Sequence, residues 1–336
     1  MAAVRTGGAA QLRGGLGVGS GGLAVRAFPR SRLLEWSILL AGLAALLGVG
    51  LVGVYRYVDN FWLYRGYAPP RDPAWVRARG TAQTISVWSP AVHRSQQVIV
   101  YLPPGYSAHP RRRYPVFYLL HGSPGVPNAL LQTVNAGVVE DELVARHKVR
   151  RLILVMPSGS TSRFTDTEWA NGIRSNSGWE TFLARDVVRA IDARYRTIRS
   201  GAGRALAGLS EGGYGALNIG FHHPREFRVI ESWSGYVRAD PVLSIFGRTK
   251  RRLTYNSPGH FVTRVARTLR RRHAFIWFYS GRADPFLRQN SAFARELARL
   301  HVRHRFLVFA GGHTWRAWRE NFPAALVAAS RGLSRG

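Results

Sequence analysis

One serine of the chain stands in a setting that suits a nucleophile. Ser210 lies within Gly208-Leu209-Ser210-Glu211-Gly212, which matches the G-x-S-x-G pattern, after an apolar run and before a stretch with helical periodicity. On such a sharp strand-to-helix turn the hydroxyl is exposed and can attack a carbonyl carbon. The two glycines leave out side chains that would clash where the turn packs against its neighbours. The alternative is a serine that only caps a helix after a glycine-rich turn.

A serine hydroxyl is a weak nucleophile, so it needs a base, and the base needs an acid to orient it. His313 follows an apolar run and two glycines, which places it in a loop beyond a strand end, where a base should lie. Asp284 follows the penultimate predicted strand and is the expected acid, although it could instead cap the next helix. The other acidic residues between the nucleophile and the base remain candidates: Glu211, Glu226, Glu231, Asp240 and Glu296.

Acyl chemistry also needs two backbone N–H groups to stabilise an oxyanion. The residue after the nucleophile, Glu211, should supply one of them. The loop His121-Gly122-Ser123-Pro124-Gly125 should supply the other, and because Pro124 has no N–H, Ser123 is the best donor. His121 is expected to be a structural hydrogen-bonding residue. The polar loop 166–172 either lines a substrate cleft or is a solvated loop.

The elements that must position these residues are short apolar runs alternating with helical patterns. Near-continuous apolar strands separated by helices predict an α/β fold, with a mostly parallel eight-stranded sheet covered by helices on both faces. The predicted strands are 84–88, 97–103, 115–122, 152–157, 205–210, 229–235, 275–281 and 305–312. The predicted helices are 137–148, 178–194, 211–223, 261–271, 288–301 and 315–332.

The N-terminal region has a different character. Residues 36–55 form a run of 20 residues without a charge, long enough to cross a bilayer as one helix. A buried soluble helix and a cleavable signal peptide are the alternatives, but no small-x-small cleavage site follows the run. We therefore predict a disordered basic tail (1–35), a transmembrane signal anchor (36–55), a juxtamembrane connector (56–82) and one catalytic domain (83–336).

The arginines and aromatic residues on either side of this run indicate how the predicted span is oriented in the membrane. More arginines precede the run closely than follow it, and an aromatic cluster follows it. Both features favour a cytoplasmic N-terminus, an interfacial belt on the far side and a catalytic domain outside the cytoplasm. The predicted location is therefore the cell membrane, with a single span.

Composition narrows the classes of function. The chain has 336 residues, 46% of them hydrophobic, and no cysteine, which excludes disulfides, a thiol nucleophile and cysteine-ligated metals. No other metal or cofactor motif is visible, so none is expected. Basic residues number 48 against 18 acidic ones, and only Lys148 and Lys250 are lysines. Either a coding bias toward arginine or an anionic partner explains this excess; no nucleic-acid-binding motif accompanies it.

As a set, five segments resemble the esterase D-like putative esterases of the α/β-hydrolase superfamily. Relatives of that family include S-formylglutathione hydrolases, feruloyl esterases and mycolyltransferases. The resemblance covers about residues 95–330. The segments, in chain order, are YPVFYLLHGSPG, LILVMPSG, GLSEGGYGALNIGFHHPREF, YSGRADP and GGHTWRAW.

The resemblance implies an α/β-hydrolase fold, a triad of Ser210, Asp284 and His313, and oxyanion donors at Ser123 and Glu211. Together with the apolar run 36–55, which lies outside the family pattern, it predicts a membrane-anchored serine carboxylesterase that acts on an ester such as a lipid or cell-envelope acyl ester. An acyltransferase that moves the acyl chain to a sugar or glycerol hydroxyl, and a non-catalytic binding protein, are the alternatives. The acidic Glu211 departs from the uncharged residue expected after the nucleophile. Asp284 departs from the glutamate that mycolyltransferases use.

Overall fold

The computed structural model describes residues 30–241 and 244–333, and the chain divides into two units, residues 1–57 and 58–336. Helix α1, Arg30–Tyr64, contains the predicted span and continues beyond 36–55 in both directions. By length and composition it is one helix that could cross a membrane, although a signal sequence would meet the same criteria. Most of the predicted tail, residues 1–29, lies outside the described residues.

The second unit is built on one eight-stranded sheet. Its strand order is β1-β2-β4-β3-β5-β6-β7-β8, and every neighbouring pair from β4 to β8 is parallel. β1 and β2 pair antiparallel with each other, and β2 pairs antiparallel with β4. The predicted mostly parallel eight-stranded sheet is therefore confirmed. The strands are β1 Thr81–Ser89, β2 Arg94–Leu102, β3 Val116–Leu120, β4 Ile153–Pro157, β5 Arg204–Leu209, β6 Val229–Trp233, β7 Phe275–Ala283 and β8 His304–Gly312.

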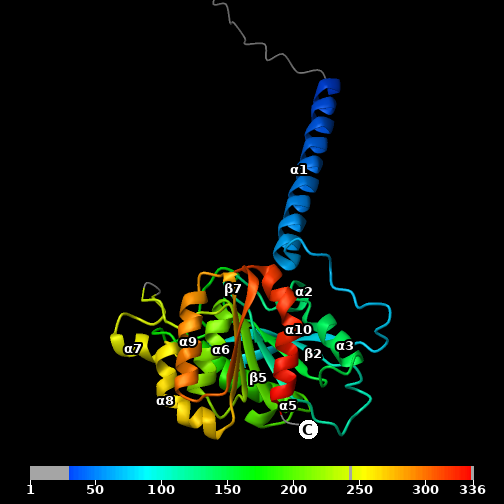
Figure 1. Ribbon diagram of the computed structural model, residues 1–336. Helices are drawn as coiled ribbons and strands as arrows, with labels where there is room; N and C mark the ends of the chain where they lie inside the picture. The colour runs from blue at the N-terminus through cyan, green and yellow to red at the C-terminus, as the bar shows by residue number, and fades with distance from the viewer. Residues whose placement is uncertain (1–29, 242–243, 334–336) are drawn as a thin grey trace, which may run out of the picture. The chain divides into compact units, whose positions relative to one another are not determined.

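Helices cover both faces of this sheet (Figure 1). Helices α6, α8 and α9 pack on one face, while α2, α3 and α10 pack on the other. Their bounds are α2 Asn128–Gln132, α3 Ala136–Ala145, α6 Glu211–His222, α7 Lys250–Tyr255, α8 Pro258–Arg271, α9 Leu287–Arg299 and α10 Trp315–Gly332. The predicted helix 178–194 consists of α4 Trp179–Thr181, the π-helical η1 Phe182–Val187 and α5 Val188–Arg194, and η2 Gly201–Gly203 is a 3₁₀ turn.

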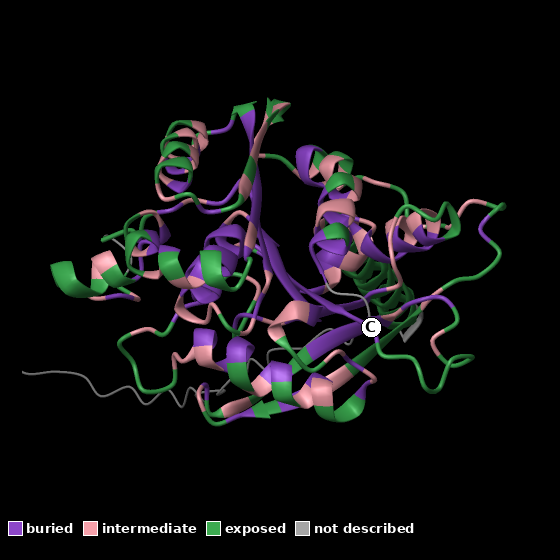
Figure 2. Ribbon diagram, turned by 60° about the horizontal axis from the view of Figure 1, so that its bottom comes forward, coloured by how far each residue is buried: buried purple, intermediate pink, exposed green. Residues whose placement is uncertain are grey.

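The central strands are buried on both faces because their residues alternate between two cores. Val116, Tyr118 and Leu120 of β3 point into the core beneath α6, whereas Phe117 and Leu119 point into the core beneath α10. Figure 2 shows the central strands and α6 as buried, whereas the outer helices are buried on one side and exposed on the other. This two-sided burial is why the strands read as near-continuous apolar runs in the sequence.

The parallel direction of the strands determines where the predicted site residues lie. The carboxyl ends of parallel strands meet at one edge of the sheet, where α/β folds place their ligand sites. The turn at Ser210 follows β5, Asp284 follows β7 and His313 follows β8. The loop that begins at His121 follows β3, so all four segments reach the same edge.

Candidate active site

Ser210 occupies a strained turn between β5 and α6. Its backbone has φ 54° and ψ −120°, which a residue with a side chain rarely adopts. The Ser210 N–H donates to the Trp233 carbonyl at 2.9 Å, and the Ser210 carbonyl accepts from Gly213 and Tyr214 at 2.9 and 3.1 Å. These hydrogen bonds from β6 and α6 hold the strained residue in place, as a nucleophile elbow requires.

The glycines around this turn allow backbone segments to approach closely. A Cβ on Gly212 would lie 2.6 Å from the His121 carbonyl oxygen and closer still to that of Leu120. A Cβ on Gly208 would collide with the Gly212 backbone. On the facing loop, a Cβ on Gly122 would be 3.1 Å from the Ser210 Cβ. The elbow and the loop after β3 are therefore in direct contact.

The structure brings the three predicted triad residues together. His313 Nε2 lies 2.8 Å from Ser210 Oγ, and His313 Nδ1 lies 3.4 Å from Asp284 Oδ2. The Asp284 side chain is fully buried, and its Oδ1 accepts from the Phe286 N–H at 2.8 Å. Burial alone would raise the pKa of Asp284, but the hydrogen bonds from His313 and Phe286 outweigh it and lower that pKa. Asp284 is thus a carboxylate, the form that can orient an imidazole.

The two predicted oxyanion donors lie on either side of the nucleophile. Glu211 is the first residue of α6, so its N–H has no acceptor within the helix. Ser123 lies two residues past His121, on the loop whose Gly122 packs against Ser210. Within residues 30–241 and 244–333, neither N–H has a hydrogen-bond acceptor. An oxyanion donor must have no other acceptor, and both N–H groups meet this requirement.

His121 has a structural role in the same loop. Its Nε2 accepts from the Gly159 N–H at 3.0 Å, so its Nδ1 carries the proton and donates to the Gly122 carbonyl at 2.9 Å. Burial lowers the pKa of His121 to about 4, which keeps the ring neutral. The His121 carbonyl accepts from Trp169 Nε1 at 3.0 Å. His121 thus joins the loop after β3 to the segment after β4 and does not contact the nucleophile.

The carboxyls of Asp166, Glu168 and Glu211 interact with one another next to the predicted nucleophile. In the sequence, the polar loop 166–172 was the only sign of this group. Glu211 is buried and accepts from the Thr167 N–H at 3.3 Å. Burial, followed by the charges of Asp166 and Glu168, raises the pKa of Glu211 well above its usual value. Burial and Asp166 likewise raise the pKa of Glu168 to about 8, although the Tyr236 hydroxyl donates to Glu168. Burial and these neighbouring charges therefore favour the uncharged form of the Glu211 carboxyl.

A pKa raised in this way favours the neutral form of the acidic residue that follows the predicted nucleophile. A charged Glu211 carboxylate would oppose the negative charge that develops on an acyl oxyanion. A neutral carboxyl removes that repulsion, and the Glu211 backbone N–H remains available as a donor. The loop that supplies the neighbouring carboxyls has a strained backbone, because Glu168 and Trp169 have φ of 54° and 50°.

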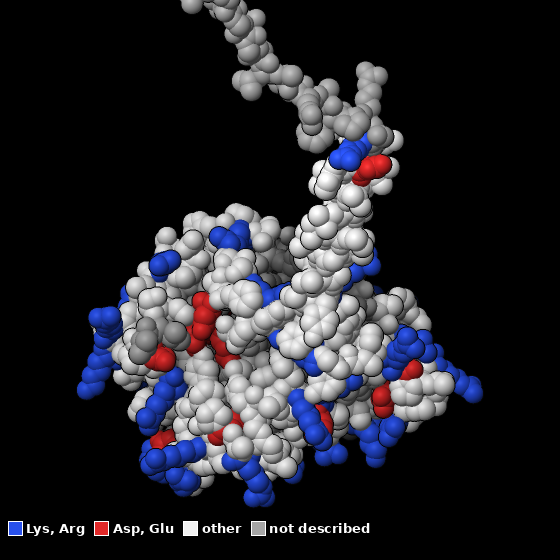
Figure 3. Space-filling model, turned by 90° about the horizontal axis from the view of Figure 1, so that it is seen from above, with Lys and Arg blue, Asp and Glu red and all other residues white. Residues whose placement is uncertain are grey.

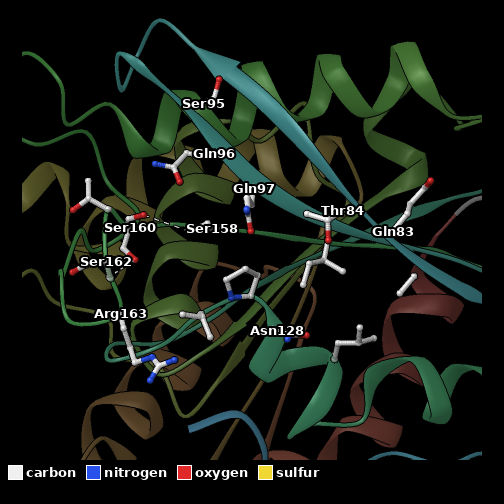
Figure 4. A pocket seen from close by; sticks show the side chains of 16 residues that line it. Gln83, Thr84, Ser95, Gln96, Gln97, Asn128, Ser158, Ser160, Ser162 and Arg163 are labelled. Atoms are coloured by element: carbon white, nitrogen blue, oxygen red, sulfur yellow. Dashed lines mark hydrogen bonds between the residues drawn. The ribbon is translucent and has the colours of Figure 1, made fainter. Parts of the chain in front are cut away.

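Two cavities differ in the residues that line them, and the first of them borders the triad-bearing segments. The first, of about 570 Å³, is lined by Glu168, Tyr236, Arg238, Phe286 and Gln289 together with the 239–241 segment. The Phe286 ring lies 5.4 Å from the His313 ring, so this cavity borders the predicted base. The second cavity, of about 540 Å³, lies over the β1–β2 hairpin and is lined by residues of this hairpin and of the 126–131 and 158–163 segments (Figure 4).

The second cavity is lined by both polar and apolar residues. Side chains that include Thr84, Gln97, Asn128, Ser158 and Arg163 surround it (Figure 4). It borders the loop after β3, because the Gly125 N–H donates to the Arg163 carbonyl at 3.1 Å. In the described part of the chain, no three His, Asp or Glu side chains are grouped so that they could hold a metal ion.

Basic and acidic side chains are distributed differently over this face of the molecule. Figure 3 shows basic side chains spread over the view, while the acidic ones form small groups. This arrangement agrees with a formal charge of +30.

Comparison with curated proteins shows similarity to esterases. An endo-1,4-beta-xylanase/feruloyl esterase of Xylanibacter ruminicola is 32% identical over 151 residues, which are 44% of this chain and 20% of that protein. An esterase of Mycobacterium tuberculosis is also 32% identical over 151 residues, which are 44% of this chain and 29% of that protein. The alignments therefore span less than a third of the length of these two relatives.

Solved structures share the fold over most of the chain. A ferulic acid esterase superposes with a TM-score of 0.68 at 25% identity, covering 76% of this chain and 99% of that one. The fluorophosphonate-binding serine hydrolase F of Staphylococcus aureus superposes with a TM-score of 0.63 at 18% identity, covering 75% and 99% of the two chains. The predicted α/β-hydrolase fold is confirmed.

The family assignment follows from the largest matched region. The sequence pattern of the family described as "Putative esterase" matches residues 89–329, which include every segment at the edge of the sheet described above. The chain belongs to the Putative esterase family.

Proposed function

We propose that the protein is a serine esterase that hydrolyses carboxylic esters through an acyl-enzyme on Ser210. The observation that carries this proposal is the continuous contact from Ser210 Oγ through His313 to Asp284. The family match and the esterase names of the relatives support the same reaction class. A ferulic acid esterase among the similar structures supports an ester as the substrate.

The proposed reaction has two halves. The Ser210 oxygen attacks the ester carbonyl carbon while its proton moves to His313 Nε2, and the carbonyl oxygen becomes an oxyanion held by the Ser123 and Glu211 N–H groups. Collapse of this intermediate breaks the ester C–O bond, and His313 returns the proton to the leaving alcohol. Water then attacks the acyl-enzyme, again with His313 as base, which releases the acid and restores Ser210. Asp284 holds the imidazole tautomer throughout.

We also propose that residues 36–55 anchor the enzyme in a membrane, with the catalytic domain on the outer side. The length of α1 and its lack of charge over this run support the span. Carbonate extraction tests it, because an inserted chain stays in the pellet. A soluble mature form that begins after residue 55 would show that the segment is a cleaved signal instead.

Fluorophosphonate labelling and ester turnover test the catalytic proposal. We expect the full-length protein in detergent to incorporate a fluorophosphonate probe and to hydrolyse p-nitrophenyl acetate. Ser210→Ala should abolish both signals, while His260→Ala, an exposed substitution on α8, should retain them. Wild-type turnover by a folded Ser210→Ala protein would refute the assignment. Product that carries the acyl group on an added glycerol or sugar would instead identify an acyltransferase.

A further inference from the structure

The segment that follows the apolar run packs against the loops around the triad. Residues 58–67 belong to the same unit as the catalytic fold. The Thr133 hydroxyl donates to the Leu63 carbonyl at 2.6 Å, and Asp59 pairs with Arg163 at 3.6 Å. The rings of Trp62 and Phe164 meet edge to face, with centroids 5.4 Å apart. This short segment therefore has a fixed place on the catalytic unit.

A series of aromatic contacts connects this segment to the predicted base. The Arg65 guanidinium lies 4.0 Å from the Trp62 ring and 5.0 Å from the Trp315 ring. Trp315 contacts Trp318 at 5.1 Å, and Trp318 contacts His313 at 5.0 Å between ring centroids. Two indole rings thus separate Arg65 from the imidazole that contacts Ser210.

The residues touched by the segment all come from parts of the chain that border the site. Thr133 follows α2, which in turn follows the loop with the Ser123 donor. Arg163 hydrogen-bonds that same loop through its carbonyl. Trp315 comes two residues after His313. The segment therefore lies at the rim of the site, and we call Trp62, Arg65, Arg163, Phe164 and Trp315 the rim cluster.

The rim cluster has the composition of a membrane interface. Its side chains are aromatic or basic, the two kinds that gather at the level of lipid headgroups. Phe164 is 70% exposed although it is a large apolar residue. Arg163 also lies over the Trp62 ring, at 5.2 Å, so two guanidinium groups share one indole. The exposed Phe164 ring can contact acyl chains, and the two guanidinium groups beside it can pair with anionic groups, so the cluster matches the chemistry of a lipid surface.

The positive charge of the cluster is only partly compensated within the protein. Asp59 pairs with Arg163, but Arg65 forms no ion pair with any carboxylate of the described residues. Burial, followed by the like charge of Arg163, lowers the pKa of Arg65. An anionic partner would relieve this repulsion. Lipid phosphate groups would supply that charge at the end of an inserted helix.

We propose that the rim cluster sits in the headgroup layer of an anionic bilayer and presents the triad to esters held in that bilayer. The proposal rests on the proposed anchor, because residue 57 is bonded directly to residue 58 and the chain passes from the apolar run straight into the cluster. A substrate with its acyl chain in the membrane would then reach Ser210 without entering bulk water. The partner is a lipid surface, and the substrate is an amphiphilic ester.

A fluorescent label tests the location of the cluster, and the absence of native cysteine makes a single label straightforward. Full-length Phe164→Cys and Arg271→Cys proteins, each carrying an NBD group, are reconstituted in phosphatidylcholine vesicles with or without phosphatidylglycerol. Arg271 is exposed at the end of α8 that precedes β7, at the opposite edge of the sheet from Ser210. We expect blue-shifted emission only at position 164, and more of it with the anionic lipid. Equal emission from both positions would overturn the proposal.

Turnover on two substrates tests the consequence for catalysis. The Arg65→Gln/Arg163→Gln protein should hydrolyse soluble p-nitrophenyl acetate at the wild-type rate. Its rate on bilayer-dissolved p-nitrophenyl palmitate in anionic vesicles should fall about tenfold, because each basic residue near an anionic surface strengthens binding several-fold. Arg271→Gln/Arg272→Gln removes two exposed charges at the opposite edge and should match the wild type on both substrates.

The possible outcomes separate the proposals. No turnover of the soluble ester by the wild type would refute the esterase assignment. A second outcome is that the wild type hydrolyses the soluble ester, while the wild type and both double variants hydrolyse the bilayer ester at equal rates in neutral and in anionic vesicles. That outcome would refute the role of the rim cluster and leave the esterase assignment intact. Release of the wild type by carbonate would refute the anchor, and the membrane position of the cluster with it.

Discussion

At the scale of single residues, the short contact between Ser210 and His313 carries most of the chemical argument. Their side chains come from positions 103 residues apart, yet Oγ and Nε2 are separated by 2.8 Å. In the proposed reaction one supplies the attacking oxygen and the other accepts its proton, so neither works without the other. This interdependence predicts how their substitutions combine.

Ser210→Ala and His313→Ala should each lower kcat by about 10⁴-fold to 10⁶-fold, and the double variant should be no worse than either single variant. The reason is that residues acting as a unit lose their whole contribution when one is removed. Turnover of p-nitrophenyl acetate measures the effect, and circular dichroism checks the fold. Additive losses in the double variant would show that the two residues act separately.

Glu211 provides a second test at this scale, because burial and the charges of Asp166 and Glu168 raise the pKa of its carboxyl. As the pH rises through that pKa, a negative charge develops beside the oxyanion and turnover should fall. Glu211→Gln keeps the backbone N–H and stays neutral, so it should match the wild type at neutral pH and lose the alkaline decline. The pH profile of kcat measures this. An unchanged alkaline decline in the variant would assign it to another group, with Glu168 as the next candidate.

At the scale of secondary-structure elements, the helix that begins at the nucleophile is held at both ends. Its first turn is fixed by the glycine contacts around the elbow, and its last turn is tied to α4 by Glu180. The Glu180 carboxylate contacts His222 Nδ1 and His223 Nε2, each at 2.9 Å, and His222 Nε2 also contacts the Tyr255 carbonyl at 3.0 Å. A shift at this end would be transmitted along α6 to the elbow.

This contact predicts a loss of stability in acid. Burial alone would raise the pKa of Glu180, but the hydrogen bonds and charges of His222 and His223 outweigh it, so this pKa lies below the usual range of a glutamate. A depressed carboxyl pKa stabilises the fold above the unfolded pKa, and this stabilisation is lost as the pH falls through the folded pKa. Glu180→Gln should therefore be less stable than the wild type at pH 7, with the difference shrinking below about pH 4.5. Urea unfolding at several pH values measures it, and a difference that stays constant with pH would contradict the explanation.

At the scale of the whole molecule, the region between the apolar run and the first strand is part of the catalytic unit. Val76 is buried, and the Gly80 N–H donates to both Asp141 oxygens at 3.2 and 3.0 Å. The Tyr101 hydroxyl donates to the same carboxyl at 2.7 Å. The predicted connector 56–82 therefore contributes to stability as well as to spacing.

Two truncations separate these contributions. A protein that begins at residue 58 should keep these contacts, whereas one that begins at residue 83 loses the burial of Val76 and the hydrogen bonds from Gly80. The loss is about 3 kcal/mol, which corresponds to a Tm lower by roughly 6 to 12 °C for a domain of this size. Differential scanning fluorimetry compares the two fragments. Equal Tm values would mean that residues 58–82 contribute nothing to the fold.

The sequence by itself determined the features that depend on neighbouring residues. Apolar runs of strand length between helical patterns predicted the parallel sheet, because a strand covered on both faces must be apolar at successive positions. The pattern around Ser210 predicted a sharp turn, and the positions of Asp284 and His313 after strands predicted the edge at which they meet. Their catalytic roles remain predictions, although the structure places the three side chains in contact.

Only the tertiary structure decided the features that depend on residues distant in sequence. The short helices α2 and α7 were not predicted, because a helix of five or six residues is stabilised mainly by tertiary contacts. The raised pKa of Glu211 depends on burial and on the carboxyls of a loop more than forty residues earlier in the chain. The rim cluster joins residues 62–65 to residues 163–164 and 315, which no local pattern relates. Local periodicity specifies which elements form, whereas the folded sheet specifies which side chains meet.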